Sequence, residues 1–183
     1  MRSVLDSPAL LSGVLFETRI GWIAVAGLNG LISDVRFGYR SERDLRDELV
    51  RRELIIDETT TLPKAFVRAR DLLMSFADGK QIDFTRLQLD LGKKTEFQKQ
   101  IIEATRRIPY GKTLSYGELA SEAGYPKAAR AVGSVMSTNR IPLIIPCHRV
   151  IASGGKPGGF SAPGELTTKM QLLQMEAGQL RKF

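Results

Sequence analysis

The chain has 183 residues, 43% of them hydrophobic, which is enough for one large domain or two small ones with a real core. It contains one cysteine and one histidine, which excludes an intramolecular disulfide and a structural zinc site built from these two residue types. The net charge of +7 is uneven: residues 1–90 carry 13 Lys and Arg against 14 Asp and Glu, and residues 91–183 carry 14 against 6. The basic half predicts an anionic partner, above all nucleic acid, with ordinary solubilising charge as the alternative.

The first half of the chain predicts a small α/β domain. Residues 14–17, 20–26 and 31–37 alternate as strands do, with Asn29-Gly30 as a turn between the last two. Ser41 precedes a helix that reaches about residue 52, and residues 63–77 predict a second helix. Residues 81–91 alternate again and are expected to pair as a strand. We therefore expect a small antiparallel sheet with helices in a domain of residues 1–91, which shows no catalytic pattern.

The second half is expected to form a mainly helical domain of residues 92–183. Thr95 is predicted to cap a helix through residue 107, and Ser115 with Glu118 is a capping-box pattern that opens a short helix over residues 116–122. Pro126 is expected at the first position of another helix, reaching about residue 137. Two short helices joined by a Gly-containing turn are typical of a helix-turn-helix. A last helix is predicted over residues 165–177.

The second of the two short helices has unusually small side chains. Ala128, Ala129, Ala131 and Gly133 stand where a surface helix usually carries long polar residues, and Arg130 projects from among them. Such a face allows a close approach, either to a neighbouring helix or to a nucleic acid. Its place in the basic half favours nucleic acid.

The cysteine and the histidine are neighbours, in the heptapeptide Ile-Ile-Pro-Cys-His-Arg-Val at residues 144–150. Because the thiolate is the reactive form and needs a base, this pair predicts nucleophilic sulfur chemistry. Either residue alone is more often a buried structural residue, but Pro146 before the pair and Arg149 after it favour a functional site. A thiol that must stay reduced indicates a cytoplasmic or nuclear location.

The sequence predicts neither export nor membrane insertion. The amino terminus lacks a basic stretch followed by an apolar one, and no apolar run approaches 18 residues.

Three motifs lie in order along the second half: Tyr110-Gly-Lys-Thr-Leu-Ser-Tyr116-Gly-Glu-Leu-Ala, Pro126-Lys-Ala-Ala-Arg130-Ala-Val-Gly133, and Asn139 followed by Ile145-Pro-Cys147-His-Arg-Val150. From about residue 95 to residue 178 the chain thereby resembles the O6-alkylguanine-DNA alkyltransferases, also called methylated-DNA–protein-cysteine methyltransferases. The resemblance implies a winged-helix-like second domain. It also implies a single, irreversible transfer of an alkyl group from O6-alkylguanine, and from O4-alkylthymine, in duplex DNA to Cys147. Such a protein acts as a monomer without a cofactor. Some relatives bind zinc in the first domain, and this chain lacks the ligands.

The resemblance also implies a role for each site residue. Cys147 receives the alkyl group, His148 takes the thiol proton through a water molecule, and Glu176 orients His148. Judged without the resemblance, Glu176 is a solvent-facing residue at a helix end. The small helix face enters the minor groove, and the damaged nucleotide rotates out of the stack. The implied DNA-binding and substrate-binding residues are Tyr116, Ala128, Ala129, Arg130, Gly133, Phe160 and Ser161, with Asn139 and Arg149 as structural supports.

The chain departs from the family pattern at three places. Phe160 stands where many members have tyrosine, Arg140 follows Asn139 where proline is common, and the stretch of residues 161–165 is longer than expected. The range of alkyl groups that the pocket accepts therefore stays open.

Three other classes of protein compete with this interpretation. A non-catalytic lesion sensor of the same fold would lack the thiol that this chain keeps at Cys147. A helix-turn-helix regulator would need Arg, Asn or Gln to read bases where this chain has alanines. A cysteine hydrolase would need an oxyanion hole and turnover.

Overall fold

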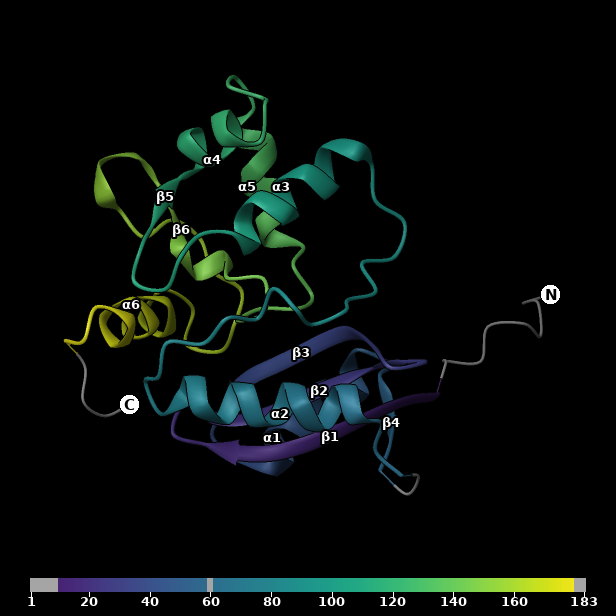
Figure 1. Cartoon of the computed structure of the whole chain (residues 1–183). Coiled ribbons are helices and arrows are strands. Elements are labelled where there is room, and N and C mark those ends of the chain that lie inside the picture. The colour runs from purple at the N-terminus through teal and green to yellow at the C-terminus, as the bar shows by residue number, and fades with distance from the viewer. Residues whose placement is uncertain (1–9, 59–60, 180–183) are drawn as a thin grey trace.

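A computed structural model describes residues 10–58 and 61–179, which form a sheet unit and a helical unit stacked on each other in Figure 1. Three antiparallel strands, β1 (Leu10–Thr18), β2 (Gly21–Leu28) and β3 (Leu31–Tyr39), follow one another as predicted. A fourth strand, β4 (Ile55–Asp57), pairs in parallel with β1, so the sheet order is β3-β2-β1-β4. The predicted purely antiparallel sheet is therefore wrong: the sheet is mixed, because a three-residue strand is too short to show alternation in the sequence.

Two helices cover opposite faces of this sheet. Ile23 and Val25 of β2 belong to the main core together with Phe66 and Leu73 of α2 (Lys64–Ala77). Ala24 points the other way and packs with two leucines, Leu45 and Leu49, of α1 (Glu42–Arg51). Because successive side chains of a strand point to opposite faces, β2 is buried on both. Both helices lie within a residue of where the sequence predicts them.

The strand predicted over residues 81–91 is wrong. This segment makes one isolated bridge to β3, between Ile32 and Leu89, and otherwise runs as a loop with a turn at Phe84–Leu87. The Arg106 guanidinium donates hydrogen bonds to the carbonyls of Phe84, Thr85 and Leu87, at 2.8 to 3.2 Å. The apolar alternation in the sequence reflects buried loop side chains, Phe84 and Leu87, rather than a strand.

The helical unit contains α3 (Glu96–Arg106), α4 (Tyr116–Glu122), α5 (Ala129–Ser137) and α6 (Glu165–Glu176), with a short parallel pair formed by β5 (Leu114–Ser115) and β6 (Val150–Ile151). The cap predicted at Thr95 and the capping box predicted at Ser115 are both present, and Thr95 also forms a capping box, with Gln98. Helix α5 begins later than predicted, because residues 125–128 form a turn in which the Ala128 N–H donates to the Tyr125 carbonyl at 2.9 Å. Helices α4 and α5 pack on each other next to α3 (Figure 1).

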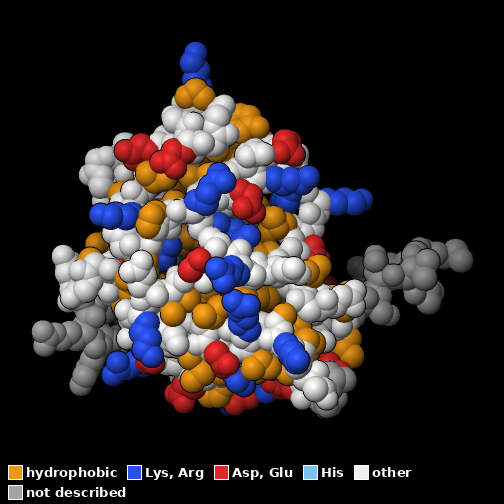
Figure 2. Space-filling model, in the orientation of Figure 1, with side chains coloured by type: hydrophobic (Ala, Val, Ile, Leu, Met, Phe, Trp, Pro, Cys, Tyr) orange, Lys and Arg blue, Asp and Glu red, His pale blue; other side chains and the backbone are white. Residues whose placement is uncertain are grey.

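One buried apolar cluster runs through both units, from Phe16 of β1 to Met175 of α6. The division into domains of residues 1–91 and 92–183 stays a prediction. In the described ranges, no helix combines the length and hydropathy that a membrane crossing requires. The predicted lack of an export signal concerns residues 1–9, which lie outside those ranges. Figure 2 shows Lys and Arg side chains gathered through the middle of one face, over the junction of the two units.

Candidate active site

The cysteine lies at the start of a short 3-10 helix, η1 (Cys147–Arg149), directly after a tight turn. The Ile145 N–H closes this turn by donating to the Ile141 carbonyl at 2.9 Å. Inside it, the buried Leu143 has a φ of 69°, a left-handed conformation that costs energy for a residue other than glycine. The two prolines around the turn thus accompany an irregular backbone, as the sequence suggests.

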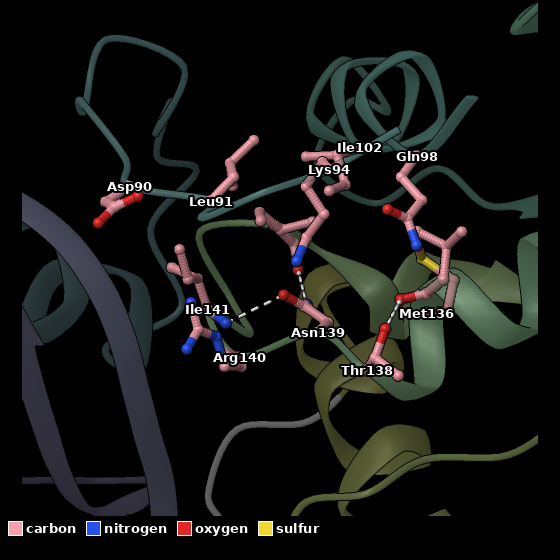
Figure 3. A pocket seen from close by; sticks show the side chains of 12 residues that line it. Asp90, Leu91, Lys94, Gln98, Ile102, Met136, Thr138, Asn139, Arg140 and Ile141 are labelled. Carbon is pink, nitrogen blue, oxygen red and sulfur yellow. Dashed lines mark hydrogen bonds between the residues drawn. The ribbon is translucent and has the colours of Figure 1, made fainter. Parts of the chain in front are cut away.

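Asn139 spans the inside of this turn. Its Oδ1 accepts a hydrogen bond from the Ile141 N–H and its Nδ2 donates to the Ile145 carbonyl, both at 3.0 Å. Figure 3 shows both bonds from the side of a small cavity of about 20 Å³, which lies between Asn139 and α3. The Asn139 carboxamide also faces the Cys147 thiol. One side chain therefore connects the end of α5 to the cysteine.

The Glu176 carboxylate is buried at the end of α6 and binds three groups at once. The His148 Nε2 lies 2.8 Å from its Oε1, and the Arg149 guanidinium contacts both of its oxygens at 2.9 to 3.1 Å. The Gly111 N–H donates to Oε2 at 2.9 Å. Gly111 has a φ of 71°, and a methyl group there would come within 3.0 Å of the Glu176 carbonyl, so a glycine is needed at this contact.

These contacts fix the protonation states around His148. Burial by itself raises the pKa of Glu176, but His148 and Arg149 outweigh it and hold this pKa at about 2. Burial lowers the pKa of His148, and with the charges of Arg149 and Lys169 it outweighs the opposing effect of Glu176, so the imidazole is neutral near pH 7. Because an ionised carboxylate only accepts hydrogen bonds, the proton of the neutral ring lies on Nε2. Nδ1 then carries a free lone pair, and it is buried without a hydrogen-bond partner among the described protein atoms.

The thiol itself is held in its neutral form at rest. Burial raises the pKa of Cys147, and the Asn139 side chain and the charge of Lys169 offset this only in part. A thiol of this kind reacts fast only if a base removes its proton during the reaction.

Lys169 is a residue at the site that sequence reasoning missed. Its side chain is fully buried, and its Nζ donates to the Val150 carbonyl at 2.6 Å and lies 6.0 Å from the centre of the Phe160 ring. Burial lowers the pKa of Lys169 to about 8, while Cys147 raises it. The signal in the sequence is a lysine on the inward face of a helix, at the same face as Leu172 and Glu176.

A cavity of about 170 Å³ opens beside the thiol. Tyr116 stands at its wall between two glycines: a methyl group on Gly158 would lie 2.9 Å from the Tyr116 hydroxyl oxygen, and one on Gly133 would lie 4.0 Å from its ring. Burial raises the pKa of Tyr116, and so does Cys147, so its hydroxyl stays a hydrogen-bond donor. The residues that line the cavity are Tyr116, Gly133, Met136, Ser137, Cys147, Gly159, Phe160 and Ser161.

The site residues predicted from the sequence thus fall into two groups. In the first group, Glu176 binds His148 and Arg149, which follow Cys147 in η1, and Asn139 braces the turn before it. The same group includes Tyr116, Gly133, Phe160 and Ser161, which line the cavity together with Cys147. The residues Ala128, Ala129 and Arg130 lie apart from the cavity, at the start of α5, and the Arg130 side chain is exposed.

The chain matches a protein-family model described as "6-O-methylguanine DNA methyltransferase, DNA binding domain" over residues 96–178. The methylated-DNA–protein-cysteine methyltransferase of Mycobacterium tuberculosis strain H37Rv is 44% identical over 160 residues, which cover 87% of this chain and 88% of that protein. The protein of the same name from Methanothermobacter thermautotrophicus is 40% identical over 118 residues, 64% of this chain and 65%, just under two thirds, of its own length.

Among solved structures, Mycobacterium tuberculosis OGT in complex with DNA superimposes with a TM-score of 0.70 at 32% identity, covering 93% of this chain and 95% of that one. The fold and the site define a class of protein in which a buried thiol lines a cavity beside two packed helices, α4 and α5. The sequence identities and coverages identify the family within this class: the chain belongs to the methylated-DNA–protein-cysteine methyltransferase family. The family and enzyme class predicted from the motifs are confirmed.

The buried carboxylate predicts a characteristic loss of stability in acid. The folded-state pKa of Glu176, about 2, lies below its ordinary value of 4.5. Its ionised form therefore stabilises the fold above pH 4.5, by on the order of 3 kcal/mol, and this contribution is lost as the pH falls from 4.5 towards 2. The free energy of unfolding, measured by urea titration across this range, should fall more steeply with acid in the wild type than in Glu176→Gln. An exposed control on the surface of α4, Glu122→Gln, should keep the wild-type slope. Parallel slopes for the wild type and Glu176→Gln would contradict this account.

Proposed function

We propose that this protein repairs DNA by moving an alkyl group from O6-alkylguanine, and from O4-alkylthymine, in duplex DNA to Cys147. The observation that carries the proposal is the arrangement around the thiol. The neutral Cys147 thiol lines a cavity of about 170 Å³. The neighbouring His148 has an unprotonated Nδ1, because its Nε2–H donates to Glu176. Nucleophile, base and orienting carboxylate follow one another as in other activated nucleophiles.

The proposed reaction is a displacement at carbon. His148 Nδ1 removes the Cys147 proton through one water molecule, and the sulfur attacks the alkyl carbon as the bond between that carbon and O6 breaks. The electron pair of the broken bond stays on the guanine, which takes up the proton that the thiol has lost. The products are a guanine and a thioether on Cys147. Because a thioether has no leaving group comparable to the guanine, each molecule acts once.

The Arg149 guanidinium has a supporting role in this proposal. It binds both Glu176 oxygens and donates to the Ile108 carbonyl at 2.7 Å. Breaking a buried ion pair of this kind leaves an uncompensated charge and is strongly destabilising. Arg149 therefore anchors η1 on the end of α3 and on α6, and Asn139 anchors its other end.

We further propose that α4, the turn at residues 123–128 and α5 form a helix-turn-helix in a winged-helix-like unit, which binds duplex DNA through the minor groove as a monomer. The small side chains of Ala128, Ala129 and Gly133 let α5 approach the DNA backbone closely, and the exposed Arg130 occupies the place of a nucleotide rotated out of the stack. A lesion inside a duplex requires such a rotation, because the O6 atom of a stacked guanine cannot otherwise enter the cavity beside Cys147.

The front of the cavity is proposed to hold the rotated base. Phe160 offers a ring on which the base can stack, and Tyr116 offers a hydroxyl group as a hydrogen-bond donor. The backbone near Ser161 offers N–H groups that can donate to O6 of the base. A solved DNA complex of the similar Mycobacterium tuberculosis protein supports DNA as the partner.

The transfer is tested by intact-protein and peptide mass spectrometry after mixing with a duplex that contains O6-methylguanine. One methyl group per molecule should appear on Cys147 and remain there with excess substrate. Cys147→Ala should take up none while keeping its DNA affinity within a few-fold, since binding is assigned to α4 and α5. Transfer in the alanine variant, or several turnovers per molecule, would exclude the proposed mechanism.

Arg130 should matter only when there is a base stack to fill. Arg130→Ala is expected to slow the methylation of Cys147 by duplex DNA at least tenfold, and to leave its reaction with free O6-benzylguanine nearly unchanged. Lys127→Ala, which removes an exposed charge next to α5, serves as the control and should weaken DNA binding only modestly. Equal losses on both substrates would show that Arg130 serves the pocket or the fold instead.

A further inference from the structure

The outer edge of the sheet contacts the catalytic segment at two points. The Val35 N–H of β3 donates to the Arg140 carbonyl at 2.8 Å, directly after Asn139 in the chain. Two residues along the same strand, the Phe37 ring packs edge-on against the Phe160 ring, with 6.2 Å between their centres. β3 is the edge strand of the sheet, so its free side faces the helical unit (Figure 1).

Both contacts border one small cavity that Cys147 also lines. A narrow cavity of about 30 Å³ between β3 and the catalytic segment is lined by Phe37, Asn139, Cys147 and Phe160, among others. The larger cavity in front of the thiol shares Cys147 and Phe160 with it. The sheet therefore forms the rear wall of the site, although it contributes no residue to the cluster around Glu176.

We infer that β3 positions the active site: the Val35–Arg140 hydrogen bond holds the Asn139 turn behind Cys147, and Phe37 holds the Phe160 ring over the cavity. This inference rests on the proposed alkyl transfer and gives the first ninety residues a part in it. In this inference Phe37 acts through its ring contact with Phe160 and is therefore a positioning residue.

The physical reason is the mobility of the segments that are held. Phe160 follows Gly158 and Gly159 and precedes the turn at residues 161–164, so the local backbone restricts its ring only weakly. An edge-to-face ring pair fixes orientation in a way that an aliphatic contact of similar volume does not.

The test compares Phe37→Leu with Phe66→Leu. Both phenylalanines are almost fully buried in the same core cluster, but Phe66 lies on α2 and makes no recorded ring contact among the described residues. The melting temperatures of the two variants should fall by similar amounts. At a temperature where both are fully folded, Phe37→Leu should react with free O6-benzylguanine about five- to tenfold more slowly than Phe66→Leu.

A double-mutant cycle separates positioning from a general loss of order. Phe160→Leu should slow the reaction strongly in the wild type and much less in Phe37→Leu, because both changes break the same contact. Amide hydrogen exchange at Val35 should accelerate in Phe37→Leu and not in Phe66→Leu.

Equal rates for the two leucine variants, or independent effects of Phe37 and Phe160, would overturn the inference while leaving the alkyl transfer intact. Failure of the wild type to transfer any alkyl group would instead remove the proposed function, and this inference with it.

Discussion

The buried Glu176 carboxylate is the interaction on which the rest of the site depends. It lies at the end of α6 and receives hydrogen bonds from His148 and Arg149 of η1 and from Gly111 of the loop after α3. Three segments far apart in the chain thus meet at two oxygen atoms. Burying a carboxylate is costly unless its oxygens are paired, and here the pairing is complete enough to keep it ionised.

The same carboxylate connects the fold to the chemistry. By accepting a hydrogen bond from the Nε2–H of His148 it leaves Nδ1 unprotonated, in a ring whose pKa burial lowers. The thiol is neutral at rest for the same reason, since burial raises the pKa of Cys147. In the proposed mechanism, such a site keeps the Cys147 thiol unreactive until an alkyl group and a water molecule lie in front of it. The sheet adds the rear wall through Phe37 and Val35.

The sequence predicts the local elements well where the signal itself is local. The cap at Thr95 and the capping box at Ser115 specify where helices begin, and both occur as predicted. The strand expected over residues 81–91 fails because its apolar residues pack as a loop that Arg106 holds. The adjacent Cys147 and His148 indicate a site by themselves. Helical spacing puts Lys169 and Glu176 on one face of α6, but their full burial depends on how α6 docks on the 3-10 helix at residues 147–149.

The most direct test of this account is the protonation state of the imidazole. Because the chain has one histidine, nitrogen-15 NMR of the labelled side chain reports on His148 without ambiguity. The account predicts a neutral ring at pH 7, with its proton on Nε2 and a pKa below the ordinary 6.5. Glu176→Gln should change the ring signals, whereas the exposed control Glu118→Gln should not. An imidazolium at pH 7, or a neutral ring with its proton on Nδ1, would contradict the central claim.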